Sequence, residues 1–218
     1  MKKLIIAISS LWLVLISNSM SMDLRASVGV SGNMAAYAAT GIENNYNEAG
    51  TAIDTITKEY GAFDTEYGSV FVELGLNDVI SIGVDYVPQT IETPKNTANK
   101  NEGNVNHVEA HFEDLTTLYA KINTPLGGTY LKVGYSSVDV TSVETMSSGN
   151  KYGNDTSSGM TVGLGYNHEV AGGVSIRAEI TGSQFSDVKA HNGQTNKTEI
   201  LVEDMIGARG TISIVKSF

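Results

Sequence analysis

Histidine and glutamate alternate along one short stretch of the sequence, His107-Val-Glu109-Ala-His111-Phe-Glu113. In an extended strand, alternate residues point to the same face, so these four side chains would lie side by side. Imidazole and carboxylate groups at such a spacing could bind a divalent cation. The stretch is not the helical zinc motif, in which a glutamate directly follows the first histidine. The sequence therefore offers a candidate metal site here, with polar residues at the mouth of a closed sheet as the alternative.

No other group of residues in the sequence predicts catalysis. Serine and histidine are present, but no spacing identifies the nucleophile and base that a lipid-modifying enzyme would need. Gly163-Leu-Gly165 lacks the third glycine and the strand-to-helix setting of a dinucleotide site, and no phosphate-binding or calcium-binding loop occurs. We expect a protein that is not an enzyme and uses no cofactor.

The composition excludes several classes of protein. The chain has 218 residues and no cysteine, so it contains neither disulfides nor a thiolate metal site. Its 14 basic residues stand against 24 acidic ones, which argues against a nucleic-acid partner. Only 17% of the residues are charged, below the roughly 25% of soluble domains, and 23 are glycine.

The first residues have the pattern of a secretory signal peptide. Two lysines follow Met1, an apolar stretch runs from Leu4 to Ile16, and small residues precede a plausible cleavage point after Ser21. The apolar stretch is too short for a membrane-spanning helix. We therefore expect an exported protein with a signal peptide at 1–21 and one mature domain at 22–218.

Apolar and polar residues alternate with period two throughout the rest of the chain, which predicts strands with two chemically different faces. Eight segments show this pattern: 24–34, 69–76, 80–86, 117–122, 130–135, 160–166, 174–181 and 206–218. Tight turns are predicted at Asn77-Asp78, Gly127-Gly128 and Gly172-Gly173. Between the hairpins we expect four long, mobile polar loops, at about 41–64, 89–107, 141–157 and 184–197.

Two kinds of closed sheet fit this alternation, a soluble lipocalin-like binding barrel and a membrane barrel. Short turns at one end with long loops at the other are typical of the membrane kind. The polar face also carries mainly Gly, Ser, Thr and Tyr, whereas a surface in water would carry more Lys and Glu. The pattern favours an all-β, eight-stranded antiparallel up-and-down transmembrane β-barrel.

The last strand carries a more specific signal. Ile212 and Ile214 share a face with the terminal Phe218. This ending resembles the last strand of bacterial outer-membrane proteins, although Lys216 stands where those proteins usually have an apolar residue. The whole mature chain resembles the small OmpA/OmpX-like outer-membrane β-barrel proteins. The resemblance implies that Ile212, Ile214 and Phe218 form a signal for the barrel-assembly machinery, and that both chain ends are periplasmic.

Charged residues on the predicted inner face form the second candidate site. A narrow barrel is filled by its own side chains, and buried charges need partners. We expect these residues to form a salt-bridge network in the lumen: Arg25, Glu73, Asp85, Lys121, Lys132, Arg177, Glu179 and Arg209. Glu109 and Glu113 would help to balance the lumen bases. The alternative is a gated ion path or a catalytic acid–base set.

Outward-facing aromatic residues should form two membrane girdles. We place Tyr86, Phe112 and Tyr135 near the long-loop end, and Tyr166 and Phe218 near the short-turn end. The expected role is structural or surface interaction through the loops, meaning adhesion or envelope integrity. The expected partners are outer-membrane lipid, lipopolysaccharide and an unknown external ligand. A narrow channel for small or hydrophobic solutes is the first alternative, and a soluble periplasmic binding barrel is the second.

Overall fold

The computed structural model describes residues 24–47, 49–100, 104–145, 152–191 and 198–218. The predicted signal peptide at 1–21 lies outside the described residues. The strands are β1 (Arg25–Tyr46), β2 (Ile53–Gly75), β3 (Ile80–Tyr86), β4 (Ile91–Glu92), β5 (Asn96–Lys100), β6 (Asn104–Asn123), β7 (Thr129–Thr145), β8 (Asp155–Ala171), β9 (Val174–Phe185), β10 (Val188–His191) and β11 (Thr198–Ser217). In the described part of the chain, no helix is long and apolar enough to cross a membrane.

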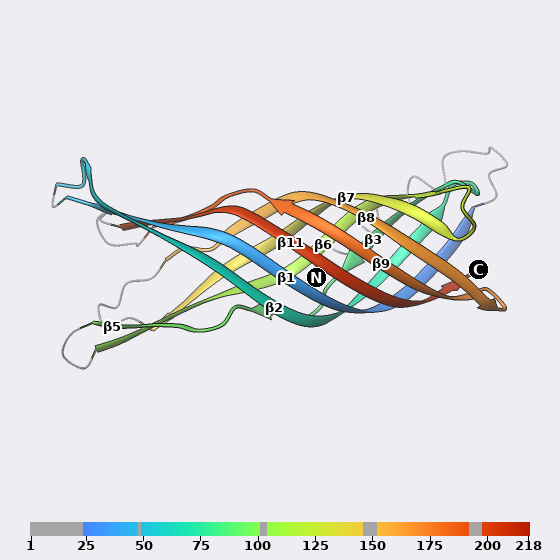
Figure 1. Ribbon diagram of the computed structural model, residues 1–218, viewed down its shortest axis with the longest axis horizontal. Helices are drawn as coiled ribbons and strands as arrows, with labels where there is room; N and C mark the ends of the chain where they lie inside the picture. Colours follow the sequence, from blue (N-terminus) through green and yellow to red (C-terminus); the bar gives the residue numbers. More distant parts are fainter. Residues whose placement is uncertain (1–23, 48, 101–103, 146–151, 192–197) are drawn as a thin grey trace.

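Eight of the strands close into a ring. Each pairs antiparallel with the next in the order β1-β2-β3-β6-β7-β8-β9-β11, and β11 pairs with β1 to close the barrel (Figure 1). The short strands β4 and β5 pair with β6, and β10 pairs with β11. The predicted eight-stranded antiparallel barrel is therefore confirmed.

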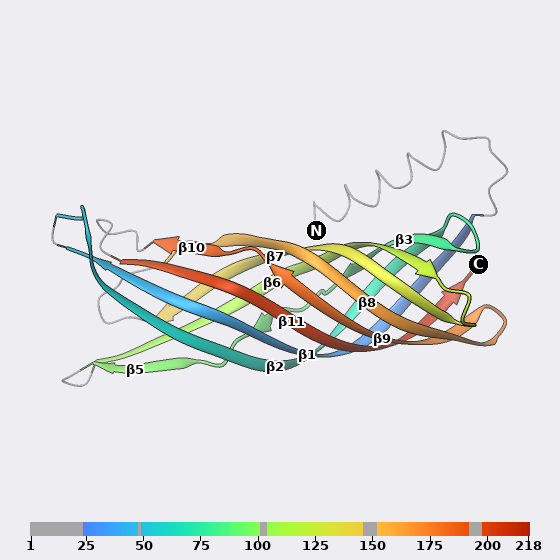
Figure 2. The same ribbon diagram turned by 45° about the horizontal axis from the view of Figure 1, so that its top comes forward.

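The two ends of the barrel differ. At one end, which we call the turn end, the strands are joined by short connections at 76–79, 124–128 and 172–173, and Phe218 lies beside them (Figure 1). Gly128, Gly172 and Gly173 take positive φ there. At the other end, which we call the sheet end, β1, β2, β6, β7 and β11 continue as an extended sheet (Figure 2).

The residue ranges expected to be long loops at the sheet end are too long, because strands occupy parts of them. The predicted loop at 41–64 is mostly a paired hairpin, because β1 runs to Tyr46 and β2 begins at Ile53. Strands also enter the predicted loops 89–107, 141–157 and 184–197, parts of which lie outside the described residues. The alternation does not predict these strands because they carry polar residues on both faces. A sheet with water on both sides needs no apolar face.

The two faces of the barrel strands have the chemistry that the alternation predicts. On β11, Ile212 and Ile214 are about 60% exposed, whereas the intervening Ser213 is 3% exposed. Most of the other barrel strands likewise expose Val, Ile, Leu and Met and bury Ser, Thr and charged side chains. The apolar side chains thus form a belt around the outside, opposite to the arrangement in a soluble barrel.

Many interior glycines make room for aromatic rings from the adjacent strand. A Cβ atom at Gly165 would lie 2.1 Å from Cζ of Tyr130, and one at Gly83 would lie 2.5 Å from Cζ of Tyr119. Gly29 stands in the same relation to Phe71, and Gly207 to Tyr37. Close contact between rings and neighbouring backbone therefore accounts for part of the high glycine content.

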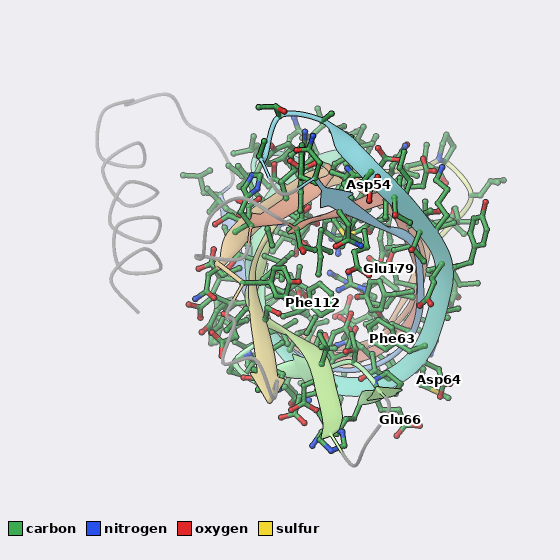
Figure 3. The ribbon with its side chains drawn as sticks, turned by 90° about the vertical axis from the view of Figure 1, so that its left-hand side faces the viewer. Asp54, Phe63, Asp64, Glu66, Phe112 and Glu179 are labelled. Atoms are coloured by element: carbon green, nitrogen blue, oxygen red, sulfur yellow. The ribbon has the colours of Figure 1, made fainter. Side chains whose placement is uncertain are left out.

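Two β-bulges mark the point where the sheet end begins. Asp114 on β6 and Asp204 on β11 both have φ of 54°, and the register shifts at each. The residues that follow, Leu115 and Met205, are buried. A bulge adds one residue to a strand and so reverses which residues face inward beyond it. Phe112, predicted to face outward, therefore points into the barrel (Figure 3).

Candidate functional site: the barrel interior

Glu73 on β2 is the centre of a buried group of charges near the turn end. Its carboxylate accepts hydrogen bonds from Lys121 Nζ on β6, from Arg177 Nη1 on β9 at 3.0 Å, and from the Tyr119 hydroxyl at 3.2 Å. All four side chains are buried. One acid thus balances two bases contributed by two other strands, and it ties three walls of the barrel together.

Glu179 on β9 organises a second group at a similar depth. It accepts hydrogen bonds from Lys132 Nζ at 2.9 Å and from the Tyr130 hydroxyl at 2.8 Å. Arg209 on β11 lies 3.9 Å from both Glu179 and Asp85, and its Nε–H donates to Thr181. Arg209 therefore links the carboxylates of two strands.

Together these groups form one charged layer across the lumen, made of four bases and three acids: Lys121, Lys132, Arg177, Arg209, Glu73, Asp85 and Glu179. Aromatic rings fill the space between them. Lys132 Nζ lies 4.2 Å from the ring centre of Tyr119, and the Arg177 guanidinium lies 5.1 Å from that of Phe71. The layer is a packed, cross-linked plug.

Arg25 does not belong to this layer, contrary to the prediction. Its side chain is 65% exposed and pairs with Asp78 of the 76–79 turn, at 3.3 Å. Arg25 is the first residue of β1, at the turn end, so the alternation continues past the point where the lumen ends.

Hydroxyl groups line the next level toward the sheet end. Thr117, Ser136, Thr161 and Ser183 form a chain of 2.8 Å hydrogen bonds across β6, β7, β8 and β9. On the facing wall, Thr211 donates to Asn33 Oδ1, and the Asn33 amide donates to Ser69. These side chains satisfy one another, so this level adds neutral polar packing above the charges.

Beyond the hydroxyl level lies an apolar cavity of about 330 Å³, which we call the chamber. It begins above the hydrogen-bonded hydroxyls of Tyr37 and Tyr67, which are 2.9 Å apart. Its wall includes Phe63, Phe112, Leu115, Val138, Phe185 and Met205. The chamber is not predictable from the alternation, because Phe112 and Val202 line it only after the two bulges change the inward-facing side of β6 and β11. The pattern Glu-Asp followed by Leu or Met, at 113–115 and 203–205, is the signal that could have revealed those bulges.

The candidate metal residues do not form a site in the structure. His111 and Glu109 lie 3.6 Å apart, but Glu113 is exposed to solvent. The described part of the chain contains no group of three or more His, Asp or Glu side chains that could hold a metal ion. The bulge turns Phe112 inward, so its neighbours His111 and Glu113 lie on the other face, away from the lumen bases.

The aromatic girdles are otherwise placed as expected. Tyr135 is 54% exposed at the sheet side of the belt, and Tyr166 and Phe218 are 48% and 73% exposed at the turn end. Tyr86 donates a hydrogen bond to Asp114 of the first bulge, at 2.7 Å. In the C-terminal strand, Ile212, Ile214 and Phe218 all face outward, and Lys216 donates to the carbonyl of Gly172.

One edge of the barrel wall is open. β2 pairs with β3 only over residues 70–75, because β3 ends at Tyr86. Residues 53–69 of β2 pair with β1 on one side, and the described residues supply no strand on the other. A side-chain contact from Gln89 to the Gly68 amide partly covers this edge. The free edge lies beside the chamber.

Comparison with solved structures agrees with this geometry. The chain is similar to the outer membrane protein OprG of Pseudomonas aeruginosa, with a TM-score of 0.53 and 12% identity over 88% of this chain and 95% of OprG. The fold is that of a small outer-membrane β-barrel. The outer membrane protease OmpT of Escherichia coli matches with a TM-score of 0.46 and 8% identity, over 93% of this chain and 99% of OmpT.

A third match is Ail, the attachment invasion locus protein of Yersinia pestis, with a TM-score of 0.41 and 9% identity over 87% of this chain and 99% of Ail. No protein-family model matches the sequence, and no curated protein matches it. The likeness to OprG, at 12% identity, is one of fold.

Proposed function

We propose that this chain is an integral outer-membrane β-barrel with a structural or surface-interaction role, in adhesion or envelope integrity. The observation that carries the proposal is the contrast between its two ends. The charged layer closes the lumen near the turn end, whereas five strands continue past the apolar belt at the sheet end. A barrel that is closed inside and extended outside is suited to act through its outer surface.

The proposed orientation places the turn end in the periplasm and the sheet end outside the cell. Signal-peptide export, lipid around the apolar belt and recognition of Ile212, Ile214 and Phe218 by the assembly machinery are all parts of this proposal. Short periplasmic turns and longer external segments are the usual arrangement in outer-membrane barrels. Lipopolysaccharide would then surround the base of the extended sheet.

The free edge of β2 is the proposed contact surface. An unpaired strand edge can pair with an extended segment of another chain. Ile56 and Tyr60 on this strand are 61% and 83% exposed. Asp64 and Glu66 point away from the barrel, where they could bind lipopolysaccharide through divalent cations (Figure 3).

Adherence of intact cells tests the surface role. Ile56→Lys combined with Tyr60→Lys should reduce adherence to protein-coated surfaces severalfold, because lysines on an edge strand oppose strand addition. Leu126→Lys is the matched control, since Leu126 is 75% exposed at the other end. Equal adherence of all three strains would contradict the surface role. Each protein should fractionate with the outer membrane and show heat-modifiable mobility on a gel.

A narrow channel for small or hydrophobic solutes is the second candidate, and the chamber is the observation in its favour. The charged layer argues against it, because ion pairs and rings fill the cross-section below the chamber. Planar-bilayer recording separates the two. We expect no steady conductance from the wild-type barrel, and openings after Arg177→Ala; steady wild-type openings would favour the channel.

A further inference from the structure

We propose that the chamber is a binding site for a small, uncharged, apolar molecule of one or two rings. The inference goes beyond the surface role, because it assigns a ligand class to an interior space. It rests on the size of the chamber, the chemistry of its wall and the position of its opening.

The size of the chamber sets an upper limit for the ligand. At about 330 Å³ it lies at the lower end of the range for small-molecule sites. An apolar cavity of about 150 Å³ is enough to bind benzene in another protein. The chamber is therefore large enough for a two-ring molecule and too small for a folded peptide or a complete lipid.

The side chains that line the chamber disfavour a charged ligand. Not one of the side chains that line the chamber is charged, and three of the four aromatic residues among them form a stack. The rings of Phe63 and Phe112 are 6.2 Å apart and nearly parallel, and Tyr37 stacks on Phe63 at 5.5 Å. The Tyr37 hydroxyl is engaged with Tyr67, and that of Ser157 donates to the Ser186 carbonyl. A charged ligand would lose its hydration without gaining a partner.

Residues on both sides of the free edge of β2 line the chamber, and we place its opening there. Residues 61–63 of β2 line the chamber on one side of the gap that β3 leaves when it ends at Tyr86, and Ile91, Thr93 and Pro94 line it on the other. The hydroxyl level and the charged layer close the chamber on its turn-end side. The ligand therefore enters and leaves near the sheet end, without crossing the plug.

Ala110→Phe tests the proposal by filling the chamber. Ala110 lines it and lies two residues before Phe112 on the same face of β6. Ala120→Phe is the matched control, because Ala120 lies on the same strand but on the outer face, in the apolar belt. The protein is placed in lipid nanodiscs, and 1-fluoronaphthalene is titrated by fluorine NMR, with empty nanodiscs subtracted.

We expect saturable binding by the wild type and by Ala120→Phe, and at least about tenfold weaker binding by Ala110→Phe, because the added ring takes the place of the ligand. Naphthalene-1-sulfonate, added as a competitor, should not displace 1-fluoronaphthalene. No saturable binding beyond that of empty nanodiscs, or equal binding by Ala110→Phe, would overturn the proposal. If Ala110→Phe does not fold, Gly61→Phe at the opening replaces it, since a Cβ there meets nothing within 4 Å.

Discussion

Glu73 makes more charged contacts in the barrel interior than a single ion pair would. Its carboxylate serves Lys121, Arg177 and Tyr119 at once, and its side chain is 4% exposed. Breaking a buried ion pair by removing one partner costs far more than the intact pair contributes, because the remaining charge is left without compensation. Removing the charge of Glu73 would leave two buried cations, Lys121 and Arg177, without this partner.

Replacing Glu73 with glutamine should therefore destabilise the barrel strongly. We expect Glu73→Gln to lower the free energy of unfolding by roughly 3 kcal/mol, because the amide can accept hydrogen bonds but cannot balance either cation. Urea unfolding in lipid vesicles, followed by the gel mobility shift, measures the change. Glu66→Gln is the control, since Glu66 is exposed on the same strand. A Glu73→Gln midpoint equal to that of the control would show that the layer does not depend on this charge.

The two bulges determine how β6 and β11 pass from the apolar belt to the sheet end. Each places an aspartate at φ of 54° and then buries an apolar residue, Leu115 or Met205. Bulges are frequent at the rims of barrels, where they redirect side chains. In this barrel the residues next to the bulges form part of the chamber wall. The backbone geometry of β6 and β11 therefore helps to make that wall apolar.

Asp204 tests whether the bulge conformation matters. Valine at positive φ is strained, so Asp204→Val should lower the free energy of unfolding by roughly 1–2 kcal/mol. Asp204→Gly should leave it close to wild type, because glycine adopts this conformation readily. The same urea titration compares the two variants. If valine and glycine behave alike, strain at this position does not contribute to stability.

The sequence predicts the membrane-facing part of each strand well and the sheet end poorly, for one physical reason. Inside the belt, lipid on one side and a packed lumen on the other impose alternation, so Ile212 and Glu73 can be placed from the sequence. Beyond it, water surrounds both faces and the pattern disappears at Tyr46 and Ile53, although the backbone remains paired. The bulges then invert the expected face of Phe112, so that its ring lines the chamber.

At the scale of the whole molecule, the barrel is closed near one end and extended at the other. Function through the outer surface requires the sheet end to face the outside of the cell. The short turns and Phe218 would then face the periplasm. This orientation can be tested directly because the chain contains no cysteine, so a single introduced thiol is the only site for a maleimide.

Single-cysteine labelling should show opposite results at the two ends. Asp54 is exposed near the tip of the β1–β2 hairpin, and Leu126 is exposed in the 124–128 turn. In intact cells, a membrane-impermeant maleimide should label Asp54→Cys and leave Leu126→Cys unlabelled until the outer membrane is permeabilised. Both purified variants should label fully, because both positions are exposed in the folded barrel. Labelling of Leu126→Cys alone in intact cells would reverse the orientation and remove the extended sheet as a cell-surface contact.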